Sequence, residues 1–156
     1  MIGVDFMNKK EIIEVLEKLV SEWFASSQQN AIHSKIMEDK GLHKLASRLA
    51  EEAKEEFEEA QKVIGRILEL GGTPKIVSKE LPIFYDIQEL LMDIYKVTEA
   101  GLKELSLLEA KITDDFITKN MIQQFILDEK EHYDWAREDV KLIELVGLEN
   151  YILEQR

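Results

Sequence analysis

Cysteine is absent from the 156 residues, and proline occurs only twice. Without cysteine the chain cannot form disulfides, thiolate zinc sites or iron–sulfur clusters, and it has no cysteine nucleophile. With only seven glycines as well, little interrupts the chain, which favours long helices. Hydrophobic residues make up 45% and charged residues 33%, a composition typical of a folded protein. We therefore expect one globular domain spanning residues 1–156.

Long apolar runs are also missing, and basic residues are outnumbered. No run approaches the roughly 18 apolar residues of a membrane span, and the start, MIGVDFMNKKE, lacks the layout of a signal peptide. The 32 acidic and 20 basic residues give a formal charge of −12, which repels phosphate backbones and attracts cations. Solubility alone is a sufficient reason for such a charge. We expect a cytoplasmic protein that binds neither membranes nor nucleic acids.

Apolar residues recur at helical spacing in four long segments, and no segment alternates like a strand. The predicted helices cover residues 8–38, 42–71, 83–111 and 115–146. Short connections make the first and second helices one antiparallel hairpin and the third and fourth another. Between the hairpins, about a dozen residues (71–82) can span about 40 Å when extended, roughly the length of a 28-residue helix. The predicted fold is an all-α four-helix bundle with one long crossover between the second and third helices.

The fourth helix carries the most specific motif. At 100° per residue, Glu129 and His132 fall on the apolar face set by Phe125, Ala136 and Val140. A carboxylate and an imidazole directed into a core are costly unless something pairs with them. For this motif alone, a buried histidine that bonds a nearby glutamate is the ordinary interpretation. The other helices therefore decide whether a metal site is indicated.

In the second helix, Glu52, Glu56 and Glu59 line one border of the apolar stripe at helical spacing. Of these, Glu56 and Glu59 form an E-x-x-E counterpart to the E-x-x-H of the fourth helix. The remaining acidic residues of this segment are interpreted as a solvated face: Glu51, Glu55 and Glu58.

The first and third helices give weaker patterns. Glu22 borders the apolar stripe of the first helix. The third helix has Thr98 in the middle of its apolar face and no carboxylate squarely on it. Glu99 has a suitable height but points off the face, whereas Glu104 and Glu109 border it nearer the C-terminal end. Helical phase leaves the choice among these three open.

These residue types suit a pair of iron ions. Two Fe(II) ions bring four positive charges, which carboxylates neutralise while offering the hard oxygen donors that Fe(III) prefers. Di-iron bundles use one glutamate from each of two helices and E-x-x-H from each of the other two. The candidate catalytic residues are Glu22, Glu56, Glu129 and His132. The candidate metal ligands are these four together with Glu59 and Glu99.

Two blocks of this sequence resemble the bacterioferritins of the ferritin-like superfamily, which also includes the Dps-like miniferritins. They are EEFEEAQKVIGRILELGGTP in the second helix and DEKEHYDWAREDVKLIELVGLENYI at the end, and the spacing from His33 to Gly41-Leu42 also fits. The resemblance covers nearly the whole chain. It implies a ferroxidase that oxidises Fe(II) and passes the iron into a hollow shell, of 24 subunits as in bacterioferritins or 12 as in miniferritins.

The family pattern maps onto Glu22, Glu56, Glu129 and His132, with three departures. Glu59 stands where the family has a histidine. Phe57 stands where bacterioferritins have the methionine that ligates haem, so we expect no haem, and Phe57 is interpreted as a packing residue on the apolar stripe. The family's third-helix glutamate falls on Glu99 when counted from the proline in the long connection, which requires about three residues to be missing before the fourth helix.

The hypothesis is therefore an iron-storage or detoxification protein that oxidises Fe(II) with dioxygen or peroxide at a di-iron site, with manganese as an alternative metal. Two other hypotheses remain. One is a peroxide-consuming di-iron or di-manganese protein of the rubrerythrin or manganese-catalase kind. The other is a bundle with a degenerate metal site and a structural role, which the weak third-helix pattern favours.

Overall fold

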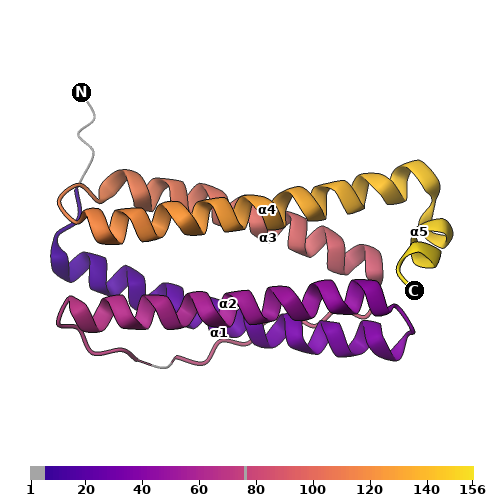
Figure 1. Cartoon of the computed structure of the whole chain (residues 1–156), viewed down its shortest axis with the longest axis horizontal. Helices are drawn as coiled ribbons and strands as arrows, with labels where there is room; N and C mark the ends of the chain where they lie inside the picture. Colours follow the sequence, from indigo (N-terminus) through magenta and orange to yellow (C-terminus); the bar gives the residue numbers. More distant parts are fainter. Residues whose placement is uncertain (1–5, 76) are drawn as a thin grey trace.

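The computed structural model describes residues 6–75 and 77–156, and every regular element in these ranges is a helix (Figure 1). The four long helices are α1 (Lys9–Asp39), α2 (His43–Glu69), α3 (Ile87–Lys111) and α4 (Phe116–Val146). A short helix, α5 (Leu148–Glu154), follows. The predicted all-α class is confirmed. None of the helices in the described ranges has an apolar stretch long enough to cross a membrane.

The connections produce the predicted topology. α1 and α2 form one antiparallel hairpin and α3 and α4 form another, while the connecting residues 70–75 and 77–86 lie along the α1–α2 hairpin from one end to the other (Figure 1). Because this crossover returns the chain to the end where α2 began, α3 runs parallel to α2. The four-helix bundle with one long crossover is confirmed.

One helix boundary and one additional helix differ from the prediction. The third helix begins at Ile87 rather than near residue 83, because the Asp86 side chain accepts a hydrogen bond from the Glu89 backbone N–H at 2.9 Å and caps the helix there. α5 was not predicted. It begins after Gly147, whose φ of 84° ends α4, and it is held by buried Tyr151, whose hydroxyl donates to Asp139 Oδ2 at 2.6 Å.

The core consists of two apolar clusters, one towards each end of the bundle. One cluster, near the α1–α2 turn, includes Met37, Leu45, Leu49, Leu91 and Tyr151. The other cluster, towards the opposite end, includes Leu16, Val63, Ile67, Ile122 and Phe125. Between the clusters lies a group of buried or partly buried polar side chains that we call the polar layer: Glu52, Glu56, Glu59, Thr98, Glu129 and His132.

Candidate metal centre

Three glutamates of α2 enter the polar layer. Glu52, Glu56 and Glu59 are spaced by four and three residues, so they share one face of the helix. That face is turned into the bundle, and the three residues are only 2%, 9% and 6% exposed. Their neighbours Glu51 and Glu58 are exposed, as predicted for the solvated face. α2 therefore places a column of three carboxylates in the middle of the bundle.

α4 contributes Glu129 and His132 from its facing side. His132 is 3% exposed, and its Nε2 lies 2.8 Å from Glu55 Oε2. A neutral imidazole that donates Nε2–H to this carboxylate keeps the lone pair of Nδ1 free, which is the form that binds a metal. Burial opposes charge on the ring, but Glu52, Glu55 and Glu129 together raise the pKa of His132 above its ordinary value.

The interpretation of Glu55 as part of the solvated face is wrong in one respect. Its side chain is 52% exposed, yet its carboxylate bonds His132. Glu55 is thus the residue that orients the candidate imidazole ligand. Its spacing to Glu52 and Glu59, three and four residues, indicated a place beside the buried column, but only the position of α4 shows which group it meets.

Burial raises the pKa of each carboxylic acid in the polar layer. The pKa of Glu56 rises to about 8, that of Glu59 to about 9 and that of Glu129 to about 7, and burial is the largest cause in all three. Nearby carboxylates add to the rise, as Asp128 of α4 does for Glu59. Burial raises the pKa of Glu52 as well, although Arg48 opposes it. Such groups ionise readily only when a cation arrives among them.

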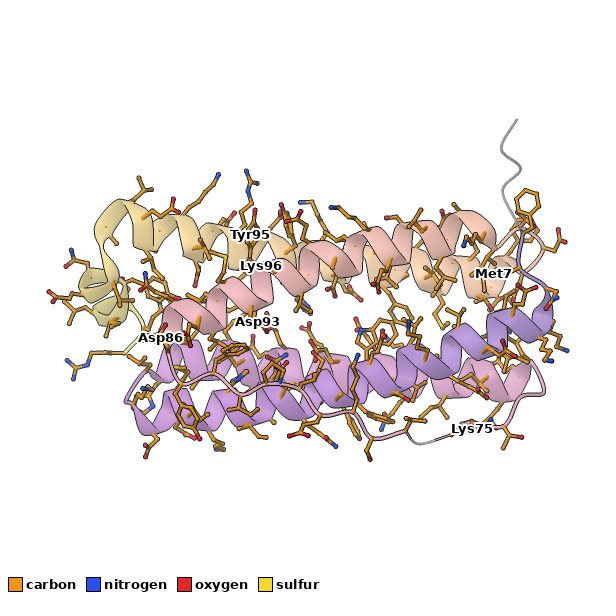
Figure 2. All side chains as sticks on the ribbon, turned by 180° about the vertical axis from the view of Figure 1, so that it is seen from behind. Met7, Lys75, Asp86, Asp93, Tyr95 and Lys96 are labelled. Atoms are coloured by element: carbon orange, nitrogen blue, oxygen red, sulfur yellow. The ribbon has the colours of Figure 1, made fainter. Side chains whose placement is uncertain are left out.

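A cavity of about 690 Å³ adjoins the polar layer between the two hairpins. Glu52, Glu56, Glu129 and His132 line it together with apolar side chains such as Trp23. α3 contributes further lining residues, among them Asp93, which lies on the side of α3 that faces α1 (Figure 2). The cavity gives a small molecule room to reach the carboxylates.

Two close contacts fix side chains of the layer from α1 and α3. Asn30 of α1 donates from Nδ2 to both carboxylate oxygens of Glu56, at 3.2 and 3.3 Å. Gly101 of α3 has no Cβ, and a Cβ there would lie 2.8 Å from Glu129 Oε1. The Glu129 carboxylate therefore occupies space that a side chain at position 101 would fill.

The candidate ligands of α1 and α3 lie elsewhere. Glu22 is at the edge of the cavity, with Oε1 3.8 Å from Lys18 Nζ and 4.0 Å from Lys79 Nζ, and its side chain is 30% exposed. Glu99 is 45% exposed and lies 3.6 Å from Lys103 Nζ. The structure therefore brings together Glu56, Glu59, Glu129 and His132, but it places Glu22 and Glu99 outside the polar layer.

Two further observations qualify the predicted site. Glu52, which was not among the candidate ligands, is the least exposed carboxylate of the layer at 2%. Across residues 6–75 and 77–156, no three His, Asp or Glu side chains are arranged so that they could already hold a metal ion. The carboxylates must therefore rotate towards one another for a cation to bind.

The placement of Phe57 on the buried apolar stripe is wrong. The ring is 47% exposed and packs on Phe24 of α1, with ring centroids 5.5 Å apart. Position 57 lies one residue past Glu56, which turns it by 100° towards the outside of the hairpin.

The fold, the polar layer and its E-x-x-H pair place this chain in a known class. Residues 13–146 match the Ferritin family, described as a ferritin-like domain, and the chain belongs to that family. Among its relatives, a bacterial ferritin of Neisseria meningitidis serogroup B is 36% identical over 149 residues, covering 92% of this chain and 96% of the relative. A bacterial ferritin of Pseudomonas aeruginosa is 33% identical over 150 residues, covering 93% and 96%. A bacterioferritin of Rhodobacter capsulatus is 28% identical, covering 92% and 91%.

Proposed function

We propose that this protein binds Fe(II) in the polar layer, oxidises it and stores the product as Fe(III). One observation carries the proposal: four carboxylates and an imidazole gather between two apolar clusters, beside a cavity, at a depth where unpaired charge is costly. Membership of the ferritin-like family and the names of the bacterial ferritins support iron storage.

The donor set fits iron. Carboxylate oxygens are hard donors that hold Fe(II) and prefer Fe(III), and an imidazole suits either state. Two Fe(II) ions carry four positive charges, which the carboxylates of Glu52, Glu56, Glu59 and Glu129 balance when ionised. Glu56 of α2 and Glu129 of α4 would hold the iron with hard carboxylate oxygens. Glu59 and His132 would supply a further carboxylate and an imidazole to the ligand set.

The protein's own groups prepare the site for this reaction. Glu55 fixes the ring of His132, and Asn30 fixes the carboxylate of Glu56. The buried carboxylic acids hold protons at neutral pH because burial raises the pKa of Glu56 and Glu59 to about 8 and 9. Fe(II) displaces these protons as it binds. Two Fe(II) ions then supply two electrons, and a dioxygen that takes up two electrons and two protons becomes hydrogen peroxide.

Storage requires an enclosed volume, so we propose that the chain assembles into a closed shell, of 24 or 12 subunits in the family. Large apolar side chains on the outside of the bundle fit subunit contacts. Phe57 on α2, Phe116 on α4 and Leu145 near the end of α4 are 47%, 76% and 82% exposed.

A bundle with a degenerate site is the second candidate. It is favoured by the positions of Glu22 and Glu99 outside the polar layer, and by the absence of a converged ligand set in the described residues. Metal binding separates the two candidates, because a degenerate site binds no more Fe(II) than a variant without the E-x-x-H glutamate.

The test is aerobic addition of Fe(II) to wild-type protein and to Glu129→Ala, with Glu138→Ala as a control because Glu138 is an exposed glutamate of the same helix. We expect the wild type and the control to consume dioxygen and to retain iron through gel filtration. Glu129→Ala should lose most of both properties. Wild-type protein that behaves like Glu129→Ala overturns the proposal.

A further inference from the structure

The ionisable groups of the polar layer come from two helices rather than four. Glu52, Glu56 and Glu59 belong to α2, and Glu129 and His132 belong to α4. Beside the layer, α1 contributes Trp23 and Asn30, and α3 contributes Thr98 and Gly101; Asn30 bonds Glu56, and Gly101 adjoins Glu129. None of these four residues has an ionisable side chain. Two carboxylates of α3, Asp93 and Glu104, also line the cavity but are not part of the layer. A metal in this layer would therefore be held mainly by side chains of α2 and α4.

At the layer, the inward-facing Trp23 of α1 makes a packing contact, and Thr98 of α3 makes a hydrogen bond within its own helix. Trp23 packs on Phe125 of α4, with ring centroids 4.6 Å apart. The hydroxyl of Thr98 donates to the carbonyl oxygen of Ile94 on its own helix at 2.7 Å. Glu22 and Glu99, each one residue away from these positions, are turned by about 100° and pair with lysines. A metal in the layer would therefore gain a carboxylate from α1 or α3 only if a side chain that now lies outside the layer moved into it.

Glu52 of α2 can supply the carboxylate that α1 and α3 do not provide. It is 2% exposed, lines the cavity with Glu56, Glu129 and His132, and lies one helical turn before Glu56. Its nearest cation is Arg48, whose Nε is 3.3 Å from Oε1. Arg48 is shared, because its Nη1 also lies 3.5 Å from Glu131 and its guanidinium covers the Trp135 ring at 5.0 Å. Arg48 thus leaves Glu52 with coordinating capacity for a second cation.

We propose that Glu52 is a metal ligand and that the centre is built by α2 and α4 alone, from Glu52, Glu56, Glu59, Glu129 and His132. The inference rests on the proposed function, since it requires that the polar layer binds Fe(II). The four carboxylates supply the four negative charges that two Fe(II) ions need without any contribution from α1 or α3. These two helices supply space, through Gly101 and the cavity, and they position Glu56 through Asn30.

The test is anaerobic titration of metal-free protein with Co(II) and with Fe(II), measuring the ions bound per chain by calorimetry and by metal analysis after dialysis. The variants are Glu52→Gln, Glu22→Gln and Glu99→Gln, which change the net charge equally. Glu51→Gln is the control on α2, because Glu51 is exposed beside Glu52. Circular dichroism checks that each variant folds.

Wild type, Glu22→Gln, Glu99→Gln and Glu51→Gln are expected to bind two ions per chain. Glu52→Gln should lose one ion or bind about tenfold more weakly or worse. Glu52→Asp, which keeps the charge but withdraws the oxygens by one methylene, should also bind more weakly, and it serves as the test if Glu52→Gln does not fold. Wild-type binding by a folded Glu52 variant, or loss of metal in Glu22→Gln or Glu99→Gln, overturns the inference. Wild-type protein that binds no metal overturns the proposed function itself.

Discussion

Replacement of Glu56 by glutamine should change how the stability of the metal-free protein depends on pH. Glu56 is buried, and burial raises its pKa from an ordinary 4.5 to about 8. Below pH 4.5 the side chain is protonated in both the folded and the unfolded states, so its contribution to stability is complete. Above pH 4.5 the unfolded chain releases the proton and the folded chain does not. Stability is therefore lost as the pH rises from about 4.5 through about 8.

The size of this loss follows from the shift. Each unit of pKa difference corresponds to about 1.4 kcal/mol, so the Glu56 carboxyl alone should cost roughly 3 kcal/mol of unfolding free energy by pH 7. Glutamine does not ionise, and its Oε1 can still accept the hydrogen bond from Asn30 Nδ2. The variant should match the wild type near pH 4.5 and exceed it by several kcal/mol at pH 8.

The assay is urea unfolding of chelator-treated protein at several pH values, followed by circular dichroism. Fe(II) added anaerobically at pH 8 should reverse the order, because it stabilises the wild type by binding the ionised carboxylate and stabilises the variant less. Equal pH dependence in wild type and Glu56→Gln would show that the pKa of Glu56 is not raised in the folded protein. Metal-free wild-type stability that rises between pH 5 and pH 8 would also contradict the raised pKa.

Two further substitutions and a haem-binding assay test individual parts of the site. Glu59→Ala should lose or weaken one metal per chain, as measured by metal analysis, whereas Glu58→Ala should bind normally because Glu58 is 52% exposed and pairs with Lys54. Gly101→Ala puts a Cβ 2.8 Å from the Glu129 carboxylate and should weaken Fe(II) binding about tenfold without unfolding the helix. Incubation with haem should give no Soret band, since Phe57 has no ligating atom, and a spectrum with sulfur axial ligation contradicts this.

The sequence was sufficient for the architecture because the helices are long and their connections differ in length. The start of the fourth helix also agrees with the prediction: Asp115, the first residue of the predicted segment, accepts the Thr118 N–H at 3.0 Å and caps α4. The start of the third helix at Ile87 and the existence of α5 were not predicted. Between Pro82 and Asp86 no residue type excludes a helix, so the sequence alone does not show that these residues are extended. A helix of seven residues, such as α5, is too short for its apolar residues to show a helical repeat.

For the site, the sequence was reliable where a residue lies at the centre of a face and weak where it lies at an edge. Glu129 and His132 are central on α4 and face the layer. Glu22 and Glu52 both border an apolar stripe, but Glu22 points to the cavity edge and Glu52 is buried. Phase within one helix cannot separate these outcomes, because the choice depends on which neighbouring helix covers that edge.

Iron binding in the polar layer can be observed directly by anomalous diffraction at the iron edge from crystals loaded anaerobically with Fe(II). Two peaks per chain are expected in the polar layer, between α2 and α4, within ligand distance of Glu56 and Glu129. Peaks found only at the outer carboxylates Glu22 or Glu99, or no peak in the polar layer, would contradict this expectation.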